Sequence, residues 1–189
     1  MTETEKKAGR VSSRDRLLDA AADIVSKQGV QQLTIEAVAQ AASVTKAGLI
    51  YHFKTRDDLL AALVDRMIGE LDMLVRPSPG PGAADVAPKD ALVELERETF
   101  EMPEDRRRLM TNLLSAVLAN PHLAAPAQGL YARTYDWLAT SGAESGQVMI
   151  LALALDAIAL LELLNLHRFT PQQRDALRAA IGSAIGALR

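Results

Sequence analysis

Apolar residues recur every three or four positions along most of the chain, and this spacing predicts a protein built from helices. Between residues 17 and 25, and again between 59 and 74, the apolar side chains fall on one face of a helix. Similar patterns follow residues 89, 104 and 122. No alternating apolar and polar run is long enough to predict a strand. The pattern therefore indicates an all-α fold of about nine helices.

Hydroxyl residues mark the starts of several predicted helices. A hydroxyl side chain at that position can accept a backbone N–H that has no partner within the helix. The residues that precede an apolar periodic segment in this way are Ser12, Thr34, Thr45, Thr55 and Thr170. Prolines at 103 and 121 are expected to end two helices of the second half. The segment 77–88 carries four prolines and is predicted to be a loop.

The segment from Thr34 to Phe53 predicts two short helices joined by a tight turn. Ile35 and Val38 lie on one face of the first helix, residues 42–44 make the turn, and a second helix follows. Two helices joined by about 3–4 residues form a helix-turn-helix, whose second helix fits the major groove of DNA. An ordinary helical hairpin with a polar face would have the same spacing.

The side chains of the second short helix suit contact with DNA. Lys46 lies near its start, where side chains reach base edges. Tyr51 and His52 carry donors for phosphate oxygens, and such contacts fix position rather than sequence. Ala47 and Gly48 are small enough to let the helix backbone approach the groove closely.

Residues 13–60 resemble the DNA-binding domain of the TetR family of transcriptional repressors. The resemblance rests on an ordered pattern from Leu33 to Leu63, LTIEAVAQAASVTKAGLIYHFKTRDDLLAAL, with VTKAGLIYHF at its centre. Two positions depart from the family pattern. Arg56 stands where members most often have lysine, and Gly48 stands where many have threonine or alanine, so that a methyl contact to a thymine could be missing. The residues that the resemblance and the residue types together assign to DNA are Thr34, Thr45, Lys46, Ala47, Gly48, Leu49, Tyr51, His52, Lys54 and Arg56.

The resemblance also divides the chain into two domains. We expect residues 1–57 to form the DNA-binding domain, with residues 1–11 as a disordered arm. We expect residues 58–189 to form a helical domain for effector binding and dimerisation. No apolar run opens the sequence, so a secretory signal is not expected and the protein is predicted to be cytoplasmic.

Residues 148–166 form the most apolar segment of the chain. Asp156, Glu162 and Asn165 argue against a membrane span, because an acid near the bilayer centre costs about 2.5–3.5 kcal/mol. A helix that is apolar most of the way round is expected to pack on its own body and against a partner. The resemblance implies that the last two long helices of two subunits form a four-helix bundle. The expected dimer-interface residues are Leu153, Ile158, Leu161, Leu177, Ile181, Ile185 and Leu188.

The resemblance further implies a ligand pocket walled by the fourth to eighth helices. The candidate lining residues are Met67, Leu71, Phe100, Met110, Leu114, Val117, Tyr131, Tyr135, Trp137 and Asn165. For any single one of them, a place in the plain core is the favoured alternative. Asp156 and Glu162 lie among leucines, where a carboxylate must pair, become neutral or face water. Each could bind a cationic effector or pair with Arg133 or Arg168.

Composition excludes several kinds of chemistry. The chain has no cysteine, so disulfides, thiolate metal sites and cysteine nucleophiles are excluded. No catalytic or phosphate-binding motif appears, and the three histidines lie far apart in sequence. We therefore expect neither an enzyme nor a metal or cofactor. The net charge of −3 does not by itself indicate a nucleic-acid binder, so the DNA hypothesis depends on the local pattern.

Together these features predict a homodimeric DNA-binding regulator, in particular a repressor that a small-molecule effector releases from a palindromic operator. The alternative is a helix-turn-helix regulator controlled by a protein partner. An apolar pocket with a few convergent polar groups would favour the ligand, and a filled core with an exposed apolar patch would favour the protein partner.

Overall fold

The structure is a computed structural model that describes residues 12–75, 86–140, 142 and 144–188. Within these ranges the chain forms nine α-helices and two short 3₁₀ helices and contains no strand, so the all-α prediction is confirmed. The helices group into two compact units, divided in sequence between Leu63 and Val64. The expected arm over residues 1–11 and most of the expected loop over 77–88 lie outside the described residues.

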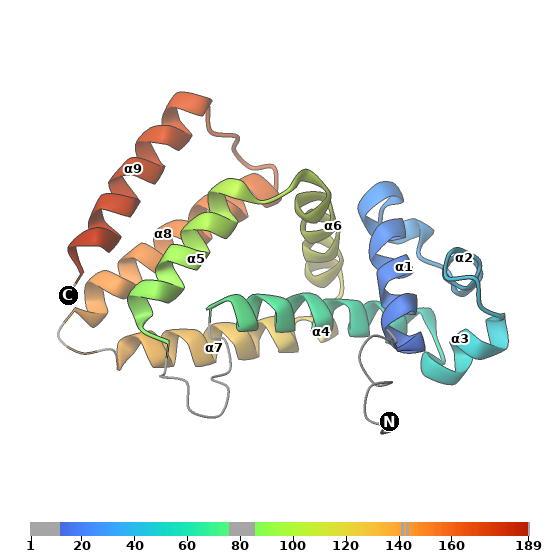
Figure 1. The fold of residues 1–189 in the computed structure, drawn as a ribbon. Coiled ribbons are helices and arrows are strands. Elements are labelled where there is room, and N and C mark those ends of the chain that lie inside the picture. Colours follow the sequence, from blue (N-terminus) through green and yellow to red (C-terminus); the bar gives the residue numbers. More distant parts are fainter. Residues whose placement is uncertain (1–11, 76–85, 141, 143, 189) are drawn as a thin grey trace, which may run out of the picture. The chain divides into compact units, whose positions relative to one another are not determined.

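The first unit contains the predicted helix-turn-helix. Figure 1 shows its second and third helices meeting at a steep angle. The turn between them contains Ser43, whose φ of 54° lies in the left-handed region. The elements of this unit are α1 (Ser13–Gln28), η2 (Val30–Gln32), α2 (Ile35–Ala41), α3 (Lys46–His52) and the start of α4 (Arg56–Val75).

The predicted helix caps are present in both units. The hydroxyl of Ser12 accepts the N–H of Asp15 at 3.0 Å, and that of Thr34 accepts the N–H of Ala37 at 3.1 Å. The Thr45, Thr55 and Thr170 hydroxyls accept from the residue three positions later in the same way. Each such bond satisfies one orphan donor of a helix start, and this local chemistry explains why the starts could be read from the sequence.

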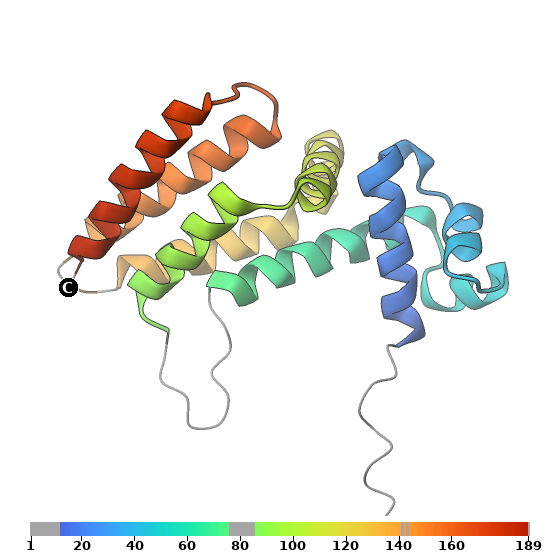
Figure 2. The same cartoon turned by 45° about the horizontal axis from the view of Figure 1, so that its top comes forward.

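The second unit is a bundle of longer helices. α5 packs against α8 and α9, and α7 packs against α8. Figures 1 and 2 show α8 and α9 running side by side in both views. Besides the end of α4, the unit consists of α5 (Pro88–Glu101), α6 (Glu104–Ala119), η3 (Pro121–Leu123), α7 (Ala125–Ala139), α8 (Ser145–Leu163) and α9 (Pro171–Ala187).

The core of the second unit joins α8 to its neighbours. Its buried side chains are aliphatic and come from α5, α7, α8, α9 and the residue that follows α9. They are Leu92, Leu138, Val148, Ala152, Leu155, Ile158, Ile181, Ile185 and Leu188. Lys89, at the start of α5, donates from Nζ to the carbonyls of Gly186 at 3.1 Å and Leu188 at 2.7 Å. A cation at these last carbonyls is favourable because it offsets the negative end of the α9 dipole.

One side of α8 remains uncovered within the chain. By length and composition it is the one helix of the described segments that could cross a membrane. Its buried side belongs to the core of the second unit, but Ile150 is 66% exposed and Leu153 is 56% exposed. The apolar character of α8 is therefore only partly explained by packing within one chain.

Candidate functional sites

Helix α3 presents a polar, exposed face. The side chains of Lys46, Ala47 and Tyr51 are exposed, with Tyr51 at 85%, and Gly48 is exposed beside them. A Cβ at Gly48 would lie 3.2 Å from Oγ1 of Thr45, so glycine leaves room for the capping hydroxyl. The predicted residues outside α3, Thr34 at the start of α2 and Thr45 and Lys54 at the two ends of α3, are exposed as well. Seven of the ten predicted DNA residues are thus exposed, and His52 and Arg56 are half-buried.

Leu49 does not belong to this exposed face. It is 0% exposed and lies in the core of the first unit. Because it falls on the inner side of α3, its side chain cannot reach DNA while the unit is folded. The prediction that Leu49 contacts DNA was therefore wrong, and its function is to anchor α3.

His52 and Lys46 each have a partner inside the first unit. Nε2 of His52 lies 2.8 Å from the hydroxyl of Ser13 at the start of α1. The ammonium of Lys46 lies 2.5 Å from a carboxylate oxygen of Glu36 on α2. That bond lowers the pKa of Glu36, whose own backbone N–H also stabilises the carboxylate. Both pairs connect α3 to another helix of the unit and fix the direction of its polar side chains.

Arg56, which the sequence assigns to DNA, forms hydrogen bonds within the first unit. Its Nε donates to the carbonyl of Leu33 at 2.7 Å and its Nη2 donates to the carbonyl of Val30 at 2.8 Å. A third nitrogen faces Asp57 at 3.6 Å. The guanidinium therefore fastens the start of α4 to the η2 segment, a geometry that the single ammonium of lysine could not reproduce.

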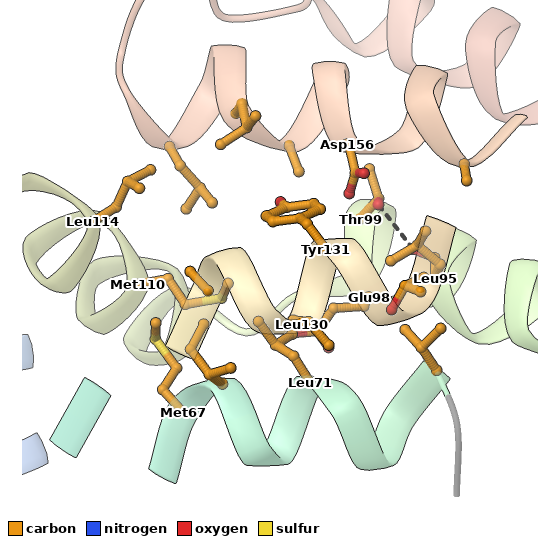
Figure 3. Close-up of a pocket in the computed structure, with 18 of the residues that line it drawn as sticks. Met67, Leu71, Leu95, Glu98, Thr99, Met110, Leu114, Leu130, Tyr131 and Asp156 are labelled. Atoms are coloured by element: carbon orange, nitrogen blue, oxygen red, sulfur yellow. Dashed lines mark hydrogen bonds between the residues drawn. The ribbon is translucent and has the colours of Figure 1, made fainter. Parts of the chain in front are cut away.

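The second unit encloses an apolar cavity of about 160 Å³. Its walls come from α4, α5, α6, α7 and α8, the same range of helices that the sequence predicted. Figure 3 shows Met67, Met110 and Leu114 toward one end, Asp156, Thr99 and Glu98 toward the other, and Tyr131 between them. Seven predicted residues line it: Met67, Leu71, Met110, Leu114, Val117, Tyr131 and Tyr135.

Three predicted lining residues lie elsewhere. Phe100 and Trp137 pack against the core of the second unit. Asn165 follows α8 and lines a separate, polar cavity of about 500 Å³ near Arg107 and Arg168. The positions of Phe100 and Trp137 on their helices turn them away from the apolar cavity, and Asn165 lies beyond the end of α8.

A few polar groups converge on the apolar cavity. The hydroxyl of Tyr135 donates to Oδ2 of Asp156 at 2.9 Å. Burial raises the pKa of Asp156, and the hydrogen bond from Tyr135 opposes that effect. Burial and the neighbouring carboxylate raise the pKa of Tyr135, so its hydroxyl stays protonated at neutral pH. The rings of Tyr131 and Tyr135 stack with centroids 6.4 Å apart.

Thr134 lines the cavity and was not predicted. Its Oγ1 is buried and has no hydrogen-bond partner within the described residues. A signal for it was present, because Thr134 follows Tyr131 by three residues and so falls on the same helical face. Thr99, which lines the cavity from α5, differs from Thr134 because its hydroxyl donates a hydrogen bond to the carbonyl of Leu95 at 2.8 Å.

Glu162 has partners other than the expected ones. Arg107 donates to it at 3.0 Å, and Arg174 forms a closer pair with the same carboxylate. The two arginines suggested by the sequence are bonded elsewhere, Arg133 to Asp72 at 2.9 Å and Arg168 to the side chain of Asn165 at 3.2 Å. The carboxylate of Glu162 therefore forms structural ion pairs that join α8 to α6 and α9.

The predicted interface residues divide into two groups. Leu153 is exposed on α8, and Leu161 and Leu177 are partly buried. The other four, Ile158, Ile181, Ile185 and Leu188, are buried in the core of their own unit. The structure corrects the expectation that these four contact a second subunit, because each packs in the core of its own chain. On α9 the larger side chains turn inward and small residues are exposed instead.

The two units together define a class of protein. A helix-turn-helix with an exposed polar second helix, in one chain with a helical body that encloses an apolar cavity, is the architecture of a DNA-binding transcriptional regulator. Residues 17–63 match the family described as bacterial regulatory proteins, tetR family, and residues 91–185 match the tetracyclin repressor-like C-terminal domain. The chain belongs to the TetR family of transcriptional regulators. Because members of this family are not enzymes, family membership confirms that part of the prediction.

Individual relatives agree with this assignment. The chain is 30% identical over 105 residues to the HTH-type transcriptional regulator AcrR of Shigella flexneri, an alignment that covers 54% of this chain and 47% of AcrR. The chain thus aligns with about half the length of that relative. A transcriptional regulator from Rhodococcus sp. Rha1 has the same fold, with a TM-score of 0.66, 20% identity and coverage of 93% and 95% of the two chains.

The multidrug binding protein EbrR is a further structural neighbour. Its structure in complex with ethidium has a TM-score of 0.65 and 26% identity, and the match covers 92% of this chain and 98% of EbrR. The similarity therefore extends across both units of this chain.

Proposed function

We propose that the protein is a cytoplasmic repressor that binds a palindromic operator as a homodimer and leaves it when a small molecule enters the apolar cavity. The observation that carries this proposal is the cavity itself. It lies in the body of a DNA-binding regulator, has an almost wholly apolar wall, and contains a few polar groups from α5, α7 and α8. Such a site is typical of small-molecule binding. This favours a ligand over a protein partner as the regulating signal.

A second subunit is supported by the uncovered faces of α8 and α9. Residues Ile150, Leu153 and Leu160 form an exposed apolar stripe at helical spacing on α8. The exposed face of α9 is made of small residues, which permit close helix packing: Ala176, Ala179, Ala180, Ser183, Ala184 and Ala187. We propose that these faces form the isologous interface of a two-fold dimer. Two α3 helices would then contact two half-sites of an operator.

Release follows if the ligand binds one state of the dimer better than the other. Occupying the cavity changes the packing between α4 and the helices that line it. A ligand with higher affinity for a dimer whose α3 helices are wrongly spaced for DNA shifts the population toward that state. The EbrR neighbour was solved with ethidium bound, which supports a small-molecule effector for this chain as well.

The proposal is tested by mobility shift with DNA from upstream of the protein's own gene, against a random fragment of equal length, at two salt concentrations. We expect selective binding that persists at the higher salt, because base contacts add to the salt-sensitive phosphate term. Compounds that bind the protein are then added to the complex, and an effector should release the DNA. Binding that is equally strong on both fragments and is lost at the higher salt concentration would contradict operator recognition. Retention of the complex at saturating ligand would contradict release.

A further inference from the structure

Of the two acids that line the cavity, Glu98 and Asp156, Asp156 has no cationic partner within the described part of the chain. The other acid there, Glu98, is ion-paired with Arg106 at 2.6 Å. Among the residues that the structure describes, no lysine, arginine or histidine forms an ion pair with Asp156, and its carboxylate accepts a hydrogen bond from the hydroxyl of Tyr135 at 2.9 Å. The carboxylate therefore faces an apolar space with a single neutral donor.

This arrangement is unfavourable in the empty protein. A carboxylate removed from water needs compensation by a counter-charge or by several hydrogen bonds, and one phenol supplies little of it. Burial accordingly raises the pKa of Asp156. A proton is one remedy, and a cation that enters the cavity is the other.

The neighbours of Asp156 suit an organic cation rather than a metal ion. The stacked rings of Tyr131 and Tyr135 come from α7, and the negative face of a tyrosine ring attracts an organic cation. The unpartnered hydroxyl of Thr134 offers one more polar contact. Away from these groups the wall is formed by Met67, Met110 and Leu114, which fit an uncharged body (Figure 3).

We propose that the cavity binds lipophilic organic cations, with Asp156 as the counter-ion and the Tyr131–Tyr135 pair holding the aromatic or alkylammonium part. The proposal rests on the effector role of the cavity and names the chemical class of effector. The volume of about 160 Å³ is close to that of engineered cavities of about 150 Å³ that accept benzene, so one-ring compounds fit without rearrangement.

The test uses two compounds of the same shape that differ in charge. Benzyltrimethylammonium is a permanent cation, and neopentylbenzene is its neutral isostere, with carbon in place of nitrogen. Each is titrated into the full-length protein at neutral pH by isothermal titration calorimetry. We expect the wild-type protein to bind the cation at least about tenfold more tightly than the isostere, a ratio that corresponds to one ion pair of ordinary strength.

Two variants separate the charge of Asp156 from its shape. Asp156→Asn keeps an acceptor for the Tyr135 hydroxyl and removes the charge, so the preference for the cation should disappear while binding of the isostere is retained. Asp136→Asn makes the same change on an exposed position of α7 and should leave the preference intact. Circular dichroism and thermal melts confirm that both variants are folded.

The outcomes distinguish this inference from the proposed function. Equal affinity of the wild-type protein for both compounds, or undiminished cation binding by Asp156→Asn, would overturn the cation inference and leave the effector cavity in place. Binding of the isostere without binding of the cation would also overturn the cation inference and leave the effector cavity in place. If neither compound binds the wild-type protein, the cation inference is overturned, and the mobility-shift experiment decides the proposed function separately.

Discussion

Glu36 and Lys46 form an ion pair across the helix-turn-helix, with Nζ of Lys46 lying 2.5 Å from Oε1 of Glu36. Glu36 lies on α2 and Lys46 begins α3, so the pair joins the two helices that would meet DNA. Both side chains are exposed. The pair therefore holds Lys46 in the absence of DNA and places a negative charge beside the proposed DNA surface.

Removing the acid should strengthen DNA binding. In Glu36→Gln the ammonium of Lys46 is released toward phosphate and a repulsive charge disappears, so we expect operator affinity to rise about threefold to tenfold at low salt. Mobility shift across a salt series measures the change. In Lys46→Ala, affinity should fall and the slope of log K against log salt should decrease by about one if Lys46 contacts a phosphate. A tighter-binding Lys46→Ala would contradict this assignment.

Tyr51 and Leu49 occupy opposite faces of α3, and their substitutions should separate binding from folding. Tyr51→Phe removes one hydroxyl from an 85% exposed side chain, so we expect weaker operator binding with an unchanged free energy of unfolding. Leu49→Ala should cost about 2–5 kcal/mol of stability, because it empties a fully buried position. Urea unfolding and mobility shift are measured on both proteins. A loss of stability in Tyr51→Phe without a loss of DNA affinity would reverse the two roles.

Local features of the fold could be predicted from the sequence. Thr34 and Thr45 cap α2 and α3 as expected, because a cap depends only on the next three residues. The end of α8 was placed too late. The sequence shows apolar residues up to residue 166, but the helix stops at Leu163 and Asn165 adopts a φ of 53°.

Features that depend on distant residues could not be predicted in the same way. The periodicity of α9 identifies an apolar face, but it does not say whether Ile181 faces its own unit or a second subunit. The structure places it in the core with Leu155 of α8. The same limit applies to Glu162, whose partner Arg107 lies 55 residues away in sequence. Leu49 was misassigned because a family motif contains residues that hold the helix as well as residues that touch DNA.

The exposed stripe of α8 gives a direct test of the dimer. Leu153→Asp places a charge on a 56% exposed position, so the monomer should fold normally while the proposed interface is disrupted. We expect sedimentation equilibrium to show a shift from dimer to monomer. Ile185→Asp serves as the contrast, because this core residue should unfold the second unit instead. A Leu153→Asp protein that sediments as the wild type does would exclude this face as the interface.

The Glu162 cluster is expected to stabilise the second unit. The side chain of Glu162 is 9% exposed, and its charge is balanced by Arg107 and Arg174, which are 25% and 21% exposed. Glu162→Gln would remove the nearest counter-charge of two partly buried guanidinium groups and would leave Arg107 with the more distant Glu104, at 3.9 Å. We expect a loss of about 2–4 kcal/mol, below the upper range for fully buried pairs because the arginines retain some water. Urea unfolding measures it, and Asp175→Asn, at an exposed position of α9, should change stability by less than about 0.5 kcal/mol. Similar losses in both variants would contradict a special role for Glu162.

The charge of Asp156 should destabilise the empty protein at neutral pH. The comparison is with a variant that lacks this charge, and the destabilisation should become smaller in acid. Burial raises the pKa of Asp156 in the folded state above its unfolded value. A raised folded pKa means that the favourable contribution is complete below the unfolded pKa and is lost as the pH rises through the folded pKa. The Asp156→Asn variant has no proton to lose, and its amide oxygen can still accept the hydrogen bond from Tyr135.

We therefore expect Asp156→Asn to be more stable than the wild type at pH 7 without ligand, and the difference to shrink as the pH falls toward the unfolded pKa of about 3.9. The other titratable groups that face Asp156 do not alter this difference. Tyr131 and Tyr135 stay protonated throughout this range, and Glu98 contacts Arg106 in the wild type and is not changed by the substitution. Urea unfolding at a series of pH values measures the gap. An Asp156→Asn protein that is less stable at every pH would show that the carboxylate is a structural acceptor that the amide cannot replace, and the argument for an uncompensated charge in the cavity would fail.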